Sequence, residues 1–186
     1  MNRQYIIDNK IDIAGLRNTL FEIPIQERLK FLIGLGSEYL ELQKCEFEIL
    51  IDERDYMVYS VVKIGNQYWT GENMSYNVKG SFINPDFPSN DYGRLYDHAQ
   101  SIKALPLGWH LPTDAEWNEL EIYHGTPPEE AFLTAERGEN TGYKLSSPDW
   151  NGTKESLFNA LPAGYYTTWD YGFNVFSSRK TGNVFQ

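Results

Sequence analysis

The chain has 186 residues, of which 41% are hydrophobic and 15% aromatic, enough for one domain with a packed core and an extension. It carries 16 Lys and Arg against 26 Asp and Glu, a net charge of −10. This balance disfavours nucleic acid and anionic membranes as partners, because both attract Lys and Arg. The single cysteine, Cys45, excludes a disulfide within the chain. The N-terminus lacks the apolar run of a signal peptide, and no stretch approaches the ~20 apolar residues of a membrane span, so we expect a protein made in the cytoplasm without an export signal.

The first fifty residues are rich in Ile and Leu and contain no Trp. Apolar spacing predicts a helix over residues 26–42, whose apolar face is formed by Leu29, Leu32, Ile33 and Leu40. Residues 45–51 alternate apolar and acidic side chains, which predicts a half-buried strand. We therefore interpret residues 1–50 as an N-terminal helix/strand extension, a candidate anchor or oligomerisation segment, and residues 51–186 as the main domain.

Two β-rich runs flank Gly65 and Asn66, and because both residues tolerate positive φ, the sequence predicts a hairpin there. Residues 79–91 contain two prolines and no apolar period, which is typical of a loop. Apolar residues then recur at helical spacing, so we expect a helix that begins near Tyr92. The residues on its apolar face are Leu95, Ala99 and Ile102.

The stretch "GWHLPTDAEWNEL", residues 108–120, is either a catalytic site or a helix start. Thr113 is followed three residues later by Glu116, the spacing of a capping box, in which hydroxyl and carboxylate each accept a hydrogen bond from a backbone N–H. A helix is therefore predicted from Thr113. The residues that share its apolar face are Trp117, Leu120 and Tyr123.

A catalytic role for His110 requires a nucleophile or an orienting partner, and the sequence marks none near it. We therefore expect His110 to be a hydrogen-bonded structural residue. His98 and His124 lie on two predicted helices without metal-ligand spacing, so no metal site is expected. No nucleotide or nucleophile motif is present either, and we predict no catalytic residues and no cofactor.

The C-terminal third reads as loops and short strands, and "YYTTWDYGF" concentrates aromatic residues there. Alternating core packing explains the pattern as well as an exposed platform for a sugar or a protein partner does. On the second interpretation, the candidate ligand-binding residues are Trp150, Tyr165, Tyr166, Trp169, Tyr171 and Phe173.

Four motifs between residues 52 and 177 resemble the Fibrobacter succinogenes major paralogous domain family in order and spacing. They are "VKIGNQYWTGENMSYNV", "YGRLYDHAQSIKALPLGWHLPTDAEWNELE", "YKLSSPDWNGT" and "FNALPAGYY". The resemblance implies an α+β, C-type-lectin-like fold: a twisted, mostly antiparallel sheet with two helices and long loops. It is distantly similar to the formylglycine-generating-enzyme-like proteins and to the variable proteins of diversity-generating retroelements.

The chain departs from the family pattern at three points. Leu105 stands where the family usually has Cys, and the cysteine of the family's final strand is also absent. The usual export or lipoprotein signal is missing. The family also continues beyond "FSSRK", so we expect either a compressed last strand in "TGNVFQ" or an open sheet edge. An open edge is a template for pairing with another chain.

The resemblance favours a non-enzymatic binding or assembly module that contacts a protein or a glycan. A phage virion component, from the tail or head decoration, is one candidate, with self-association through residues 1–50 or the open edge. An alternative is a calcium-independent carbohydrate-binding surface protein that stacks sugars on Trp169 or Tyr166. A formylglycine-generating-like enzyme is disfavoured, because that chemistry relies on reactive cysteines and only Cys45 is present.

Overall fold

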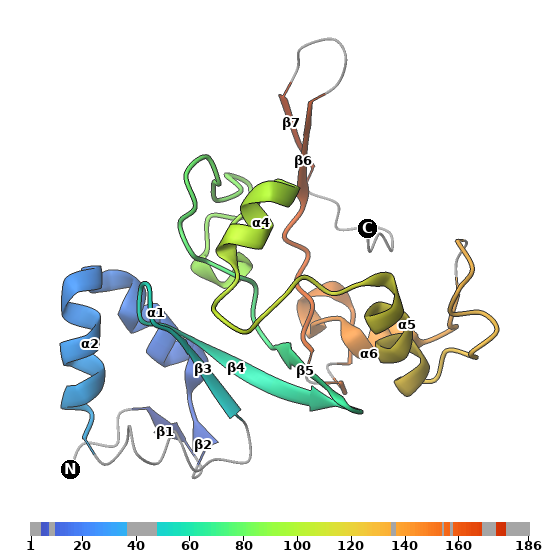
Figure 1. The fold of residues 1–186 in the computed structure, drawn as a ribbon, viewed down its shortest axis with the longest axis horizontal. Coiled ribbons are helices and arrows are strands. Elements are labelled where there is room, and N and C mark those ends of the chain that lie inside the picture. The colour runs from blue at the N-terminus through green and yellow to red at the C-terminus, as the bar shows by residue number, and fades with distance from the viewer. Residues whose placement is uncertain are drawn as a thin grey trace.

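The computed structural model describes residues 5–7, 10–36, 48–134, 137–153, 155–156, 158–168 and 174–177, and combines short antiparallel strands with helices (Figure 1). The strands are β1 (Ile6–Ile7), β2 (Lys10–Ile11), β3 (Glu48–Asp52), β4 (Met57–Ile64), β5 (Gln67–Thr70), β6 (Tyr165–Thr168) and β7 (Asn174–Ser177). The α-helices are α1 (Ile13–Glu22), α2 (Ile25–Gly34), α4 (His98–Ala104), α5 (Asp114–Tyr123) and α6 (Thr141–Leu145), and the 3-10 turns are η1 (Asn90–Tyr92) and η2 (Pro148–Trp150). None of the described helices has the length and apolarity needed to cross a membrane.

Strands β3, β4 and β5 form a three-stranded antiparallel sheet in the order β3-β4-β5. The predicted hairpin is confirmed: β4 and β5 pair from Ile64 opposite Gln67 outward, across a two-residue turn. Gly65 has φ +60°, a conformation that glycine adopts without steric cost. A Cβ atom there would also lie 3.2 Å from the Tyr123 ring.

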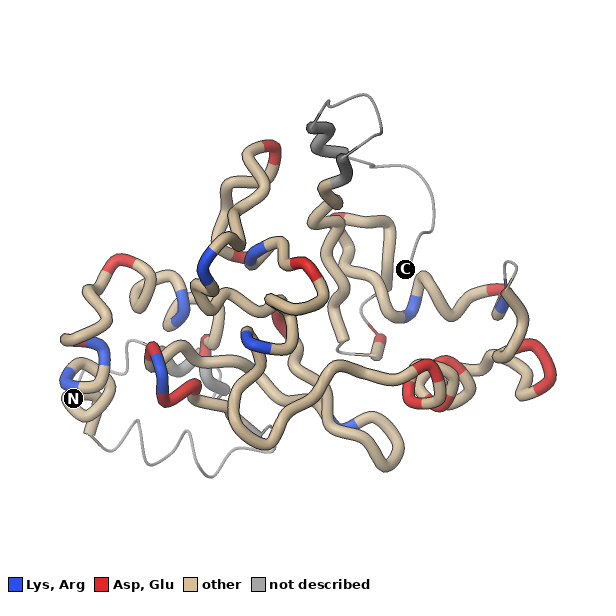
Figure 2. The backbone as a smooth tube through the Cα atoms, turned by 45° about the horizontal axis from the view of Figure 1, so that its top comes forward, with Lys and Arg blue, Asp and Glu red and all other residues tan. Residues whose placement is uncertain are grey.

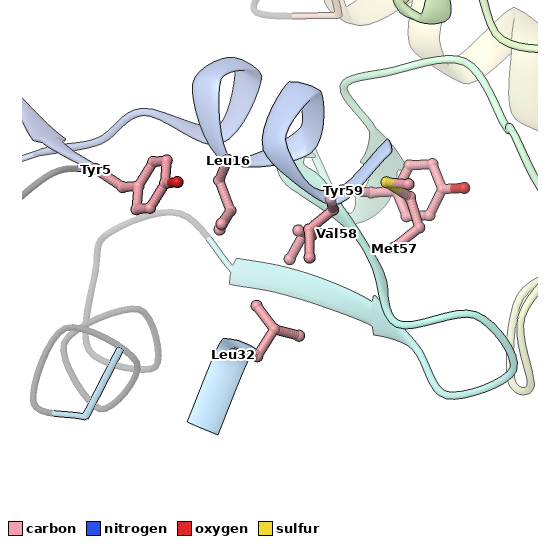
Figure 3. Close-up of a cluster of buried hydrophobic side chains, with 7 residues drawn as sticks. Tyr5, Leu16, Leu32, Met57, Val58 and Tyr59 are labelled. Atoms are coloured by element: carbon pink, nitrogen blue, oxygen red, sulfur yellow. The ribbon is translucent and has the colours of Figure 1, made fainter. Parts of the chain in front are cut away.

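Strand β4 joins two hydrophobic clusters, one at each end. Figure 1 shows α1 and α2 at one end of the sheet and α5 and α6 at the other. The first cluster is drawn in Figure 3, and its buried members are Tyr5, Leu16, Leu20, Leu32, Met57, Val58 and Tyr59. The buried members of the second cluster are Val62, Ile64, Trp69, Leu120 and Leu145. The central strand therefore contributes to both cores.

The N-terminal helices pack on the protein's own sheet. Leu16 and Leu20 of α1 are fully buried, and the buried Arg17 donates a 2.6 Å hydrogen bond to the Val58 carbonyl. The guanidinium of Arg17 also lies 4.6 Å from the centre of the Tyr59 ring. The predicted boundary at residue 50 falls inside β3, so the extension and the sheet share one core.

The predicted helix over residues 26–42 corresponds to α2, which ends at Gly34, and the predicted strand over residues 45–51 overlaps β3 at residues 48–51. Residues 37–47 lie outside the described residues. Of the predicted apolar face, Leu32 is buried, whereas Leu29 and Ile33 are 40% and 62% exposed. The helix buries its Arg28 and Leu32 side.

The helix expected from near Tyr92 begins instead at His98. Asp97 caps it, accepting from the Gln100 N–H while the Gln100 side chain accepts from the Asp97 N–H. Leu95 precedes the helix and pairs with Phe82 in an isolated antiparallel bridge. The remaining predicted face is exposed at Ala99 and, at 55%, at Ile102. The apolar spacing therefore predicted a helix that begins too early, because the capping residue Asp97 was taken as part of the helix.

Arg54 ties the β3–β4 turn to the end of α4. Its guanidinium bonds both carboxylate oxygens of Asp52, at 2.8 and 2.6 Å, and that carboxylate is 1% exposed. It also donates to the carbonyls of Lys103 and Ala104 at 2.8 and 2.7 Å. The end of α4 and the loop that follows are thus anchored against the sheet.

Candidate functional site

An open cleft of about 1470 Å³ lies beside β5. Trp150 and three segments line it; the segments are residues 66–74, which include β5, residues 105–112 with the first turn of α5, and residues 158–166. Its aromatic lining residues are Tyr68, Trp69, Trp109, Trp117, Trp150, Phe158, Tyr165 and Tyr166. These segments are far apart in sequence, so the cleft is a product of the fold rather than of any one motif.

Three rings anchor the cleft to the second hydrophobic cluster. The Trp69 ring centre lies 4.9 Å from that of Trp117 and 5.4 Å from that of Phe158, and Trp117 and Phe158 are 5.8 Å apart. Trp69 is 7% exposed, and its indole N–H donates to the Gln67 side chain at 3.1 Å. This part of the wall is held in place by packing before any ligand arrives.

The structure brings together three of the six residues predicted from sequence. Trp150, Tyr165 and Tyr166 all line the cleft. Tyr165 is 48% exposed, whereas the half-buried Tyr166 ring packs edge-on against Phe82 at 5.1 Å between ring centres. The other three, Trp169, Tyr171 and Phe173, lie outside the described residues. Trp109 also lines the cleft, although it was not among the candidate binding residues predicted from the sequence.

The capping box predicted at the start of α5 is confirmed. Glu116 accepts at 2.8 Å from both the backbone N–H and the hydroxyl of Thr113, and the Glu116 N–H lies 3.3 Å from that hydroxyl. Of the predicted apolar face, Trp117 and Leu120 pack in the second cluster, but Tyr123 is 62% exposed. The Tyr123 ring lies near the turn at Gly65, where an added Cβ atom would come within 3.2 Å of it.

His110 and Glu116 form a hydrogen-bonded pair on the cleft wall. The Nε2 atom of His110 lies 2.7 Å from Glu116 Oε1, and the histidine side chain is 69% exposed. The Thr113 backbone N–H, His110 and the Thr113 hydroxyl together lower the pKa of the Glu116 carboxyl to about 2. A carboxylate held ionised at this level is a poor proton acceptor at neutral pH, because an efficient general base has a pKa near the working pH. The expectation that His110 is hydrogen-bonded is confirmed; its partner was not identified from sequence.

Other side-chain chemistry at the cleft is limited. Its lining includes two acidic residues, Glu72 and Glu116, and no Lys, Arg, Asp, Ser or Cys among the described residues. Among all the residues that the structure describes, no group of three His, Cys, Asp or Glu side chains is placed to hold a metal ion. Asp149 and Asn151, on either side of Trp150, are both exposed.

Comparison with known proteins identifies the family. The model of the Fibrobacter succinogenes major domain matches residues 62–182, more than half of the chain. Every residue that lines the cleft lies within this match. No curated protein and no solved structure matches the chain. The chain therefore belongs to the Fibrobacter succinogenes major domain family, as its motifs predicted.

Proposed function

We propose that this protein is a non-enzymatic binding module and that its ligand occupies the aromatic cleft beside β5. The main observation in support of this binding role is the set of eight aromatic side chains in one open cleft. Tyr and Trp rings supply large contact area at low cost in side-chain entropy. The packing of Trp69 and Trp117 further lowers the cost of ordering on binding.

The polar groups of the cleft support a binding role rather than catalysis. Glu116 is committed to the helix cap and to His110, and the described lining offers no serine, cysteine or lysine as a nucleophile. Turnover of a bound ligand that is abolished in His110→Ala would replace this proposal with an enzymatic one.

The proposal includes a C-type-lectin-like arrangement for residues 51–186. Supporting it are the β4–β5 hairpin, the two capped helices α4 and α5, and the long irregular segments between them. In this arrangement, loops from distant parts of the sequence meet on one face, as the cleft-lining segments do.

The binding role is tested by intrinsic fluorescence, since four of the five tryptophans line the cleft. The protein is titrated with panels of oligosaccharides and of peptides. Trp109→Ala is expected to weaken binding by about 2 kcal/mol, roughly thirtyfold, as for a central aromatic contact. Tyr143→Ala, an exposed tyrosine of α6 away from the cleft lining, is the matched control. Equal affinity in both variants would remove the cleft as the binding site.

A second role, self-association within a larger particle such as a virion, is favoured by the outer face of α2. Ile25, Leu29 and Ile33 lie four residues apart and are 46%, 40% and 62% exposed. We propose that a second copy covers this stripe. Light scattering of the native protein tests it: Leu29→Lys should dissociate the oligomer, and Gln26→Lys on the same helix should not. A monomeric wild-type protein would rule out this role.

A further inference from the structure

Strand β5 is an edge strand of the described sheet: it pairs with β4 alone, and all four of its residues line the aromatic cleft. The hairpin closes at Ile64 opposite Gln67, and the Gly71 N–H bonds the Ser60 carbonyl at 2.9 Å. Antiparallel pairs alternate between hydrogen-bonded and non-hydrogen-bonded. Both ends of this ladder therefore give the same assignment of hydrogen-bonded and non-hydrogen-bonded pairs along β5.

The alternation turns the backbone of Tyr68 and Thr70 away from β4. Both residues stand in non-hydrogen-bonded pairs, opposite Lys63 and Val61. Within the described part of the chain, no backbone hydrogen bond is formed by either residue on its other side. Two N–H and two C=O groups thus point from the strand edge, at a spacing of about 6.7 Å per residue pair. This is the hydrogen-bonding pattern that a further strand would satisfy.

The charge around the cleft indicates whether a partner is cationic or anionic. The cleft lining contains Glu72 and Glu116 and no Lys or Arg, and the whole chain has a net charge of −10. Between Ala104 and Thr134 the chain has no Lys or Arg, and Figure 2 shows acidic positions concentrated on α5 and the loop after it. Tryptophan and tyrosine faces also attract Lys and Arg side chains. A cationic partner is therefore favoured over a neutral or acidic one.

We propose that the cleft binds an extended polypeptide segment carrying Lys or Arg at alternate positions, which adds to β5 as a further strand. The backbone groups of Tyr68 and Thr70 hydrogen-bond the segment, and its alternate side chains contact the aromatic walls. This inference rests on the proposed function, because it names the ligand class of the same cleft. A glycan would also contact the rings, but it has no repeating N–H and C=O pattern to match the strand edge.

The first experiment uses synthetic peptides as probes. An array of decapeptides with Lys or Arg at alternate positions and varied apolar residues between them is screened against the whole protein, with alternating Glu peptides as the charge control. The tightest peptide is then remade with backbone N-methyl groups on one set of alternate residues or on the other. One set should weaken binding about tenfold or more, because its N–H groups bond β5, and the other should change it less than about threefold.

The second experiment changes the strand edge. Thr70→Pro removes the N–H that points away from β4 and leaves the β4 ladder intact, and proline is tolerated on edge strands. Trp69, which precedes it, is already in a strand, the conformation that a following proline requires. Thr70→Ala keeps the N–H and is the control. Thr70→Pro should weaken the peptide about tenfold, and Thr70→Ala less than about threefold.

The outcomes separate this inference from the proposed function. Equal effects of the two N-methylated peptides, or the absence of any peptide that binds, overturn strand addition. Oligosaccharide binding that is lost in Trp109→Ala, without peptide binding, would sustain the binding module and refute the polypeptide ligand. If neither class of probe binds, the proposed function fails with the inference. The peptide comparison does not depend on how any protein variant folds.

Discussion

Leu20→Ala tests whether the N-terminal helices belong to the same cooperative unit as the sheet. Leu20 is fully buried in the first hydrophobic cluster. Replacing a fully buried leucine by alanine typically costs 2–5 kcal/mol, which combines lost transfer free energy with a residual cavity, and we expect about 3 kcal/mol here. Leu107→Ala makes the same chemical change in the loop after α4 at a side chain that is 100% exposed, and should cost less than about 1 kcal/mol.

The assay is urea unfolding followed by tryptophan fluorescence. All five tryptophans lie at residue 69 or beyond, so the signal reports on the region C-terminal to the substituted helix. With a denaturant slope of about 2 kcal/mol/M, a loss of 3 kcal/mol lowers the midpoint by about 1.5 M. Because β4 contributes to both clusters, this shift should appear in the fluorescence although none of the described tryptophans belongs to the cluster that contains Leu20.

Different transitions in circular dichroism and in fluorescence would contradict this prediction. If Leu20→Ala lowers the helical signal in circular dichroism at low urea while the fluorescence midpoint stays at the wild-type value, residues 1–50 fold independently. The shared role of β4 would then carry no cooperativity. Coincident transitions for both probes, shifted together, are the expected result.

Three further predictions concern the turn, the Arg54 anchor and the helix cap. Gly65→Ala should lower the melting temperature, because φ +60° and a Cβ contact of 3.2 Å strain any side chain there, whereas Gly34→Ala has open space and should raise it slightly. Arg54→Ala should cost about 3 kcal/mol in urea unfolding, since it leaves a buried carboxylate unpaired; a cost below about 1 kcal/mol would contradict the anchor. The folded-state pKa of Glu116 is depressed from 4.5 to about 2, so its stabilisation is present above pH 4.5 and is lost as the pH falls toward 2. Between these pH values the wild type should therefore lose more melting temperature than Glu116→Gln, and Glu129→Gln, at an exposed loop position, should behave as the wild type does.

Local signals in the sequence predicted the elements that local interactions determine. The capping box of Thr113 and Glu116 and the turn at Gly65 need only neighbouring residues, and both are confirmed. Apolar periodicity was less reliable: it placed Leu95 in a helix that begins only at His98, and the apolar helix face that it predicted includes Leu29, which is 40% exposed. In both cases the position of more distant segments determined whether an apolar side chain is covered.

The cleft itself was only partly accessible from sequence. Trp150 and Tyr166 were recognised as candidate binding residues because aromatic residues cluster near the C-terminus. Their approach to Trp109 depends on how the loop after α4 is anchored, partly by the bonds of Arg54 to the last carbonyls of that helix. Such long-range contacts leave no periodic signal in the sequence. The edge of β5 that pairs with no described strand leaves no such signal either.

The order of the two hydrophobic clusters along the chain has a consequence for synthesis on the ribosome. Every buried member of the first cluster lies between residues 5 and 59, whereas the second requires residues up to Leu145. Domains and their parts generally fold as they emerge, N-terminal first. We therefore expect β4 to be docked on α1 while the tryptophan-rich half is still being translated, so that the nascent chain already presents an ordered strand on which the second half condenses.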